Sequence, residues 1–164
     1  MEHIVSIGGW AVSDNPGDMI KTFALSTCVG LVYYSSHRPC MGMAHIQLPV
    51  SRTLPAGDLP SRYADLAPGF LLQQMVRRFG IRREELLISL YGGIDAHGHN
   101  DYFRIGEKNL SGVREALRSL SLFHSDVDTG GQVSRTLFAY VGSGVVEVIK
   151  RPMLLGNNYF PNKP

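Results

Sequence analysis

Two side chains in the first third of the chain could together carry out nucleophilic chemistry. Cys28 lies at the start of one apolar segment, and His45 lies within the next one. The thiolate is the nucleophilic form of cysteine, and an adjacent imidazole can take the thiol proton. These residue types at this spacing therefore indicate a cysteine nucleophile paired with a histidine base.

A β-hairpin would bring these two side chains together. Residues 29–34 and 41–48 are apolar and β-prone, and the polar connection at 34–39 is rich in turn-forming residues. Side chains alternate between the two faces of a strand. The second segment therefore has one face made of Met41, Met43, His45 and Gln47. We expect Cys28 and His45 to face each other from two adjacent strands.

Other residues near Cys28 could complete such a site. Thr22 lies on the preceding extended segment, and its hydroxyl oxygen can accept the second ring N–H of His45 and so fix the tautomer. Ordinary strand propensity explains a threonine at position 22 equally well. Small polar residues before Cys28 can leave backbone N–H groups free to bind an oxyanion. The candidate oxyanion or substrate-binding residues are Ser26, Thr27, Val29 and Gly92.

Each of these residues also has a purely structural interpretation. A free cysteine is often a buried, inert thiol, and a lone histidine in an apolar strand is often a core residue with satisfied hydrogen bonds. A disulfide between Cys28 and Cys40 stays open as an alternative. The segment His97-Gly98-His99, flanked by Asp95 and Asp101, suggests either a polar loop or a metal site. Since no other Cys or His pair has zinc-like spacing, we expect no metal and no cofactor.

Two amphipathic helices and several short strands must position the candidate site. Apolar residues recur at near-helical spacing over 62–79, where Pro68-Gly69 predicts an irregular start and Gly80 a stop, and over 105–120. Because the helices are separated in sequence, each is expected to cover a sheet face. The predicted strands are 3–13 (bent at Gly8-Gly9), 19–25, 29–34, 41–48, 86–91, 121–128, 133–140 and 145–150. This pattern predicts one mixed α/β domain over residues 1–150, followed by a surface tail over 151–164.

Composition narrows the class of protein. The chain has 164 residues, of which 44% are hydrophobic and 18% charged, the usual size and balance of one globular domain. A net charge of +2 with scattered basic residues does not favour nucleic-acid binding. Neither a bilayer-spanning apolar run nor a signal-peptide pattern occurs. Two cysteines are too few for a disulfide scaffold, so we expect a cytoplasmic, reduced protein.

Several of these segments resemble the CheD family, the chemoreceptor glutamine deamidases of bacterial and archaeal chemotaxis. The resemblance extends over roughly residues 3–150 through SIGGWAVSDNPG, KTFALSTCVGLV, MGMAHIQLP, RYAD, LYGG, RIGEKNL, a DV…GG segment ending in Arg135, and GSGVVEV. It implies a fold of two mixed sheets packed face to face with helices outside, similar to a bacterial toxin deamidase. It also implies that Cys28 is the nucleophile, His45 the base and Thr22 the residue that orients the histidine.

The resemblance further implies a reaction and partners. The expected reaction hydrolyses receptor glutamine side chains to glutamate through a thioester, with release of ammonia, and the expected partners are methyl-accepting receptors and a CheC-type phosphatase. Ser26-Thr27 replace the usual Gly-Ser before the nucleophile. An interaction module that binds and stimulates a CheC-type phosphatase without catalysis is the alternative. A cysteine peptidase or transglutaminase-like enzyme is a third interpretation.

Overall fold

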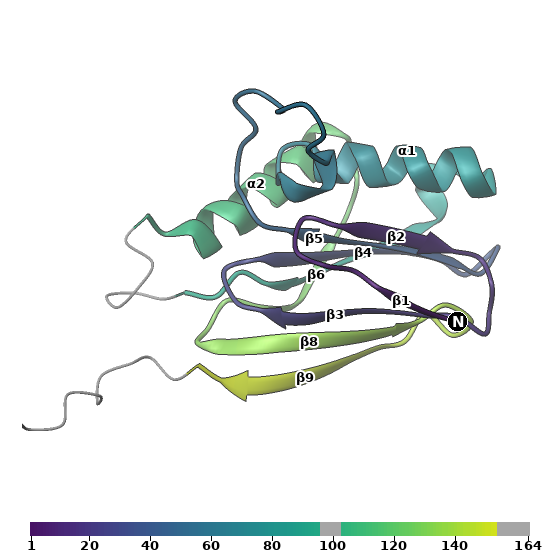
Figure 1. Ribbon diagram of the computed structural model, residues 1–164. Helices are drawn as coiled ribbons and strands as arrows, with labels where there is room; N and C mark the ends of the chain where they lie inside the picture. Colours follow the sequence, from purple (N-terminus) through teal and green to yellow (C-terminus); the bar gives the residue numbers. More distant parts are fainter. Residues whose placement is uncertain (96–102, 154–164) are drawn as a thin grey trace, which may run out of the picture.

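Two β-sheets pack face to face, and two helices cover the outside of one of them (Figure 1). The computed structural model describes residues 1–95 and 103–153. The strands are β1 (Glu2–Ile4), β2 (Trp10–Ser13), β3 (Met19–Leu25), β4 (Val29–Ser35), β5 (Cys40–Ile46), β6 (Leu86–Gly92), β7 (Ser125–Thr129), β8 (Val133–Tyr140) and β9 (Val146–Pro152). The helices are α1 (Ala67–Phe79) and α2 (Ile105–Ser119), with short 3₁₀ turns at Pro60–Arg62 and Arg83–Glu85. This arrangement confirms the predicted single-domain α/β class with two mixed sheets.

The five-stranded sheet has the strand order β2-β5-β4-β6-β7 and contains the predicted hairpin. β4 and β5 pair antiparallel, with Gly30 opposite His45. On its other side β4 pairs antiparallel with β6. Every residue of β5 is buried, because the helices cover one face of this sheet and the second sheet covers the other.

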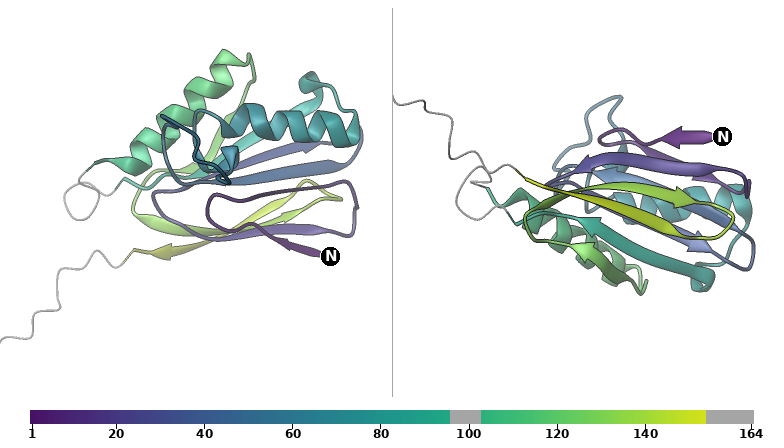
Figure 2. Two further views of the ribbon diagram at one scale, coloured as in Figure 1. Left: turned by 45° about the horizontal axis from the view of Figure 1, so that its top comes forward. Right: turned by 90° about the horizontal axis from the view of Figure 1, so that it is seen from below.

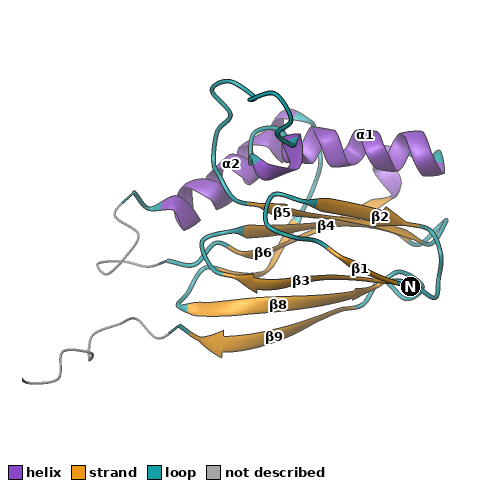
Figure 3. Cartoon of the chain, in the orientation of Figure 1, coloured by secondary structure: helices purple, strands orange, loops and turns teal. Residues whose placement is uncertain are grey.

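The four-stranded sheet has the order β1-β3-β8-β9, and no helix of the described residues covers its outer face (Figures 2 and 3). β1 pairs parallel with β3, whereas β3, β8 and β9 pair antiparallel. Along β8 the side chains alternate between buried and half-buried, the pattern of a strand with one face in the core. Thr22 of β3 therefore belongs to a different sheet from Cys28 and His45.

The hydrophobic core has two layers, one on each face of the five-stranded sheet. The outer layer lies between this sheet and the helices and includes Leu31, Ile46, Leu71 and Leu117. The inner layer lies between the two sheets and includes Cys28, Met41, Met43, Tyr91 and Leu137. Alternation along β5 thus sends Met41 and Met43 inward and Ala44 and Ile46 toward the helices, as the sequence predicted.

The first helix starts later than its apolar spacing predicted. α1 begins at Ala67, with Pro68 in its first turn, where the missing N–H of proline costs no hydrogen bond. The residues from Pro60 to Arg62 form a separate 3₁₀ turn instead. Gly80 ends the helix in the left-handed conformation, with φ of 62°, as predicted.

The predicted strand over residues 3–13 is two strands in two different sheets. β1 belongs to the four-stranded sheet and β2 to the five-stranded one, so the chain crosses between sheets near the glycine pair. Gly8 has φ of 76°, and its N–H donates to the carbonyl of His45. A local pattern of apolar residues cannot distinguish one bent strand from two strands joined by a crossover.

Two predicted boundaries near the end of the chain were wrong. The strand predicted over 121–128 starts only at Ser125, because the chain turns at residues 120–121 where α2 ends. β9 continues through Arg151 and Pro152 into the segment predicted as a tail. The segment His97-Gly98-His99 and the end of the predicted tail lie outside the described residues. Within the described ranges, no helix has the length and apolar character needed to cross a membrane.

Candidate functional site

Thr22 holds His45 through a chain of hydrogen bonds that connects the two sheets. The Thr22 hydroxyl lies 2.7 Å from the carbonyl oxygen of Val5 and 2.7 Å from Nδ1 of His45. A carbonyl oxygen only accepts hydrogen bonds, so the single hydroxyl proton of Thr22 is donated to Val5. The hydroxyl oxygen must then accept from Nδ1–H of His45. This assigns the tautomer: Nδ1 carries the proton, and Nε2 is the basic nitrogen.

Nε2 of His45 has no hydrogen-bond partner among the described residues, although it is buried. His45 as a whole is only 2% exposed. Burial lowers the pKa of His45 from about 6.5 to about 4, because an imidazolium loses its hydration there. At neutral pH this residue is therefore an uncharged imidazole with a free lone pair.

Cys28 lies on the same face of the five-stranded sheet as His45. It precedes β4 by one residue and belongs to the core layer between the sheets. Since Gly30 is opposite His45, strand alternation places Cys28, two residues before Gly30, on the same side of the sheet as His45 and one position beyond the last ladder pair, Val29 with Ile46. Burial raises the pKa of the Cys28 thiol to about 11. The resting pair is thus a neutral thiol beside a neutral imidazole.

Cys28 and Cys40 are both free, which excludes the alternative of a disulfide in this structure. Cys40 is paired with Ser35 at the turn end of the β4–β5 hairpin, whereas Cys28 lies at its open end. The two cysteines also point to opposite core layers.

The residues proposed for oxyanion binding have different positions. Ser26 and Thr27 are half-buried, next to Cys28. The carbonyls of Ser26 and Cys28 accept the N–H groups of Ile94 and Gly93. With the residues that the structure describes, the N–H of Cys28 forms no hydrogen bond, which leaves it available to an oxyanion. Val29 is paired on both sides within the sheet, and its side chain lies in the helix-side core layer, away from Cys28.

Gly92 supports the backbone of Cys28. Its φ of 89° lies in the left-handed region, and a Cβ atom there would lie 2.4 Å from the carbonyl oxygen of Cys28. The carbonyl of Gly92 also accepts the N–H of Gly130. The structure therefore gives Gly92 a backbone role beside the nucleophile candidate.

Gly92→Ala is expected to lower activity strongly, because the new methyl group must displace the Cys28 carbonyl. A displacement of about 1 Å can cost roughly 10²-fold in rate. Backbone strain adds about 1–3 kcal/mol of destabilisation, which thermal unfolding would measure. Gly57→Ala is the matched control, since its φ of 84° carries similar strain but its Cβ would meet nothing within 4 Å. Equal activity losses in both variants would contradict the steric argument.

Thr22→Val is expected to reduce turnover while preserving the shape of the side chain. The substitution leaves Nδ1–H of His45 and the Val5 carbonyl unpaired in a buried place. Such unpaired groups cost about 1–3 kcal/mol each, equivalent to about 5- to 150-fold in rate if the loss falls on the transition state. Thr22→Ser keeps the hydroxyl and should retain most activity. Steady-state rates of the two variants test this, and a fully active Thr22→Val would exclude the orienting role.

The sequence did not indicate three groups that contact the site. The Val5 carbonyl is the acceptor that fixes the Thr22 hydroxyl. Arg135 is only 3% exposed, and it binds Asp128 at 2.9 Å and the Gly130 carbonyl at 2.8 Å, so it holds the loop that supports Gly92. Asn109 of α2 binds the Thr27 carbonyl at 2.9 Å. The available signal for Asn109 was its spacing, because it falls four residues before Val113 on the apolar stripe.

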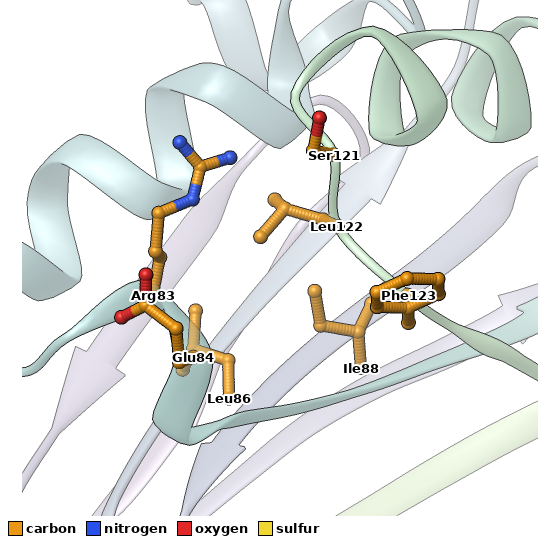
Figure 4. A pocket seen from close by; sticks show the side chains of 7 residues that line it. All are labelled: Arg83, Glu84, Leu86, Ile88, Ser121, Leu122 and Phe123. Atoms are coloured by element: carbon orange, nitrogen blue, oxygen red, sulfur yellow. The ribbon is translucent and has the colours of Figure 1, made fainter.

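The described residues give less support to a metal site or to a catalytic site in a separate pocket. They contain no cluster of three or more His, Cys, Asp or Glu residues that could hold a metal ion. A pocket of about 520 Å³ lies beside the start of β6, at the opposite end of that strand from Gly92 (Figure 4). It is lined by Arg83, Glu84, Leu86, Ile88, Ser121, Leu122 and Phe123. None of the candidate catalytic residues lines this pocket.

The fold and the site define a two-sheet α/β domain with a cysteine, a histidine and a threonine gathered between its sheets. The family model described as CheD chemotactic sensory transduction matches residues 47–150. A probable chemoreceptor glutamine deamidase CheD from Syntrophotalea carbinolica is 35% identical over 148 residues, covering 88% of this chain and 91% of the relative. One from Methanococcus vannielii is 33% identical over 147 residues, covering 89% of this chain and 93% of the relative. The chain belongs to the CheD family.

Solved structures resemble this chain more distantly. The crystal structure of Bacillus licheniformis hypothetical protein YfiH is 12% identical, with a TM-score of 0.40 over 75% of this chain and 49% of that protein. Neisseria meningitidis protein NMB0706, of the family DUF152, is 10% identical, with a TM-score of 0.42 over 74% of this chain and 51% of that protein.

Proposed function

We propose that this protein hydrolyses glutamine side-chain amides of chemotaxis receptors to glutamate, with Cys28 as nucleophile, His45 as base and Thr22 as the residue that orients His45. One observation carries the proposal: the hydrogen-bond chain from Val5 through Thr22 leaves a free basic nitrogen on the face that Cys28 shares. Membership of the CheD family supports the choice of substrate, because the relatives are named as probable chemoreceptor glutamine deamidases.

The first half of the reaction forms a thioester. Sγ of Cys28 attacks the amide carbon of the substrate while its proton passes to Nε2 of His45. The carbonyl oxygen becomes an oxyanion and accepts the N–H of Cys28. When the C–N bond breaks, the imidazolium of His45 gives its proton to the leaving nitrogen, and ammonia is released.

The second half hydrolyses the thioester. Nε2 of His45 takes a proton from water, and the resulting hydroxide attacks the thioester carbon. The C–S bond then breaks, the sulfur recovers its proton from His45, and the substrate keeps a carboxyl group in place of its amide. No cofactor takes part in this sequence.

The pKa values of the two groups support general-base catalysis rather than a stored ion pair. Burial raises the pKa of Cys28 to about 11 and lowers that of His45 to about 4, so the thiolate–imidazolium form is disfavoured in the resting site. Proton transfer must then accompany attack on the substrate. In the resting site such a thiol is protected from oxidation, because thiolate is the reactive form.

The substrate that we propose is a helical segment of a receptor, docked over the open end of the β4–β5 hairpin. Cys28 is 8% exposed, so a glutamine side chain has to reach into the edge of the space between the sheets. Its conversion to glutamate adds a negative charge to the receptor helix and changes the electrostatics between neighbouring helices.

The molecule that attacks the thioester distinguishes deamidation from related reactions such as transglutamination. Water on the thioester gives deamidation, whereas an amine would give a crosslink by the same first steps. Adding a primary amine to the reaction tests this directly, since incorporation of the amine into the substrate would indicate transglutamination.

A CheC-type phosphatase is the second partner in this proposal, and family membership is its support. Binding without catalysis would make the chain an interaction module. Titration of the Cys28→Ala variant against such a phosphatase separates the two roles, because a binding role does not need the thiol.

The test of the function is ammonia release from a glutamine-bearing receptor fragment, with intact-mass analysis of the fragment. We expect the wild-type protein to release ammonia in step with amide-to-acid conversion at discrete glutamines. Absence of both signals on receptors from the same source would overturn the proposed reaction.

A further inference from the structure

Asn109 is a polar residue on the buried stripe of α2. Its side chain is completely buried, on the helix face that it shares with Val113 and Leu117. A fully buried amide is unfavourable unless its polar atoms are paired. This residue therefore needs a specific role that an apolar residue could not fill.

The amide of Asn109 donates two hydrogen bonds. Its Nδ2 lies 2.9 Å from the carbonyl oxygen of Thr27 and 3.0 Å from that of Gln47. Because both partners can only accept, the NH₂ group must face them, and this assigns the orientation of the amide. Its Oδ1 is buried and has no hydrogen-bond partner in residues 1–95 and 103–153, which costs stability.

These two carbonyls belong to the segments that carry the nucleophile and the base. Thr27 directly precedes Cys28, and Gln47 is two residues after His45. The last backbone pair of the β4–β5 ladder is Val29 with Ile46. Beyond that pair, the Asn109 amide connects the two chain segments, since two carbonyl oxygens cannot bond to each other.

The start of α2 packs closely enough for this contact. A Cβ atom on Gly106 would lie 2.1 Å from the Ile94 carbonyl oxygen, and one on Gly93 would lie 2.4 Å from the Leu110 side chain. Two glycines therefore let the helix approach the segment that follows β6. In that same segment, the N–H groups of Gly93 and Ile94 donate to the carbonyls of Cys28 and Ser26.

We propose that Asn109 is a positioning residue, which sets the distance between Cys28 and His45 by joining the Thr27 and Gln47 carbonyls. The inference rests on the proposed function only in assigning these two side chains as the reacting pair. Asn109→Asp keeps the shape of the side chain but places a carboxylate oxygen against two carbonyl oxygens. The substitution should separate the two segments at the open end of the hairpin.

The test is a double-mutant cycle on Cys28 alkylation by iodoacetamide, in which sulfur displaces iodide and the thiol proton passes to His45 or solvent. Peptide mass analysis measures the alkylation of Cys28 separately from that of Cys40. At pH 7, His45→Ala should slow alkylation at least about tenfold in the wild-type background, and less than about threefold with Asn109→Asp or Asn109→Ala. The alanine variant avoids the added charge and covers the case in which the aspartate variant does not fold.

Leu117→Ala is the matched control, because Leu117 is equally buried on the same helix but lies two turns from Asn109. It should lower the melting temperature while keeping the full effect of His45→Ala. The positioning role would be overturned if His45→Ala slowed Cys28 alkylation as much in the Asn109 variants as in the wild type. It would also be overturned if His45→Ala did not slow alkylation in the wild type.

Receptor deamidation is measured separately: we expect the Asn109 variants to lose kcat with little change in KM. Coupling in the alkylation cycle without any deamidation by the wild type would refute the proposed function and leave the positioning role in place.

Discussion

Cys28→Ala should abolish release of ammonia from receptor glutamines, with a loss of at least roughly 10⁴-fold in kcat, the scale seen when an acyl-transfer nucleophile is removed. The expectation follows from the position of Cys28 at the edge of the space between the sheets, on the face shared with the free Nε2 of His45. Without the sulfur no thioester forms, and no other described nucleophile shares this position. Cys28→Ser should be inactive too, because an alcohol is far harder to ionise than a thiol.

Cys40→Ala is the control for this experiment. Cys40 is the other cysteine of the chain, but it lies at the turn end of the hairpin in the helix-side core layer. Its removal should leave most of the activity intact. Ammonia assays and intact-mass analysis of the receptor fragment are run on all the variants at equal folded concentration. Substantial deamidation by Cys28→Ala would show that another group performs the attack.

His45→Ala should reduce kcat/KM by about 10³-fold or more at pH 7. A thiol with a pKa of about 11 is ionised to only about one part in 10⁴ at that pH, so the reaction depends on a base to take its proton. The variant can react only through this small thiolate fraction. Its rate should therefore rise about tenfold for each pH unit between pH 6 and 9.

The wild-type protein should show a different pH profile. Its rate should stay nearly constant between about pH 6 and 9 and fall only as pH approaches 4, where the buried imidazole of His45 becomes protonated. A midpoint near 6.5, or parallel pH profiles for the wild type and His45→Ala, would contradict the role of His45 as the base. His124→Ala is the control, since His124 lies beside Asp126 outside the site and should leave the profile unchanged.

The same protonation affects stability in a defined direction. The unfolded chain binds a proton at His45 near pH 6.5, whereas the folded chain binds it only near pH 4. Folding therefore loses stability as pH falls from 6.5 to 4, and the His45 contribution is fully present above pH 6.5. Denaturant unfolding at several pH values measures this effect. Between pH 6.5 and 4, the free energy of unfolding should fall less in His45→Ala than in the wild type.

The amino-acid sequence by itself determined the parts of this protein that depend on local pattern. The alternation of Met41, Met43 and His45 defined the inner face of β5, and the turn residues after Tyr34 defined the hairpin. Gly80 marked the end of α1 through its left-handed conformation. These features are local because strand alternation, turns and helix caps involve residues within a few positions of each other. The shared face of Cys28 and His45 follows from them.

Tertiary structure alone decided how the two sheets complete the site. Thr22 reaches His45 from the opposite sheet, and one further strand, β4, lies between their two strands in the sequence. The residues over 3–13 divide between the sheets, which places the Val5 carbonyl against Thr22. Asn109 approaches from a helix more than sixty positions away from Gln47 or Thr27. Such contacts depend on how layers pack over long sequence separations, and apolar periodicity specifies only which face of an element is buried, not which element covers it.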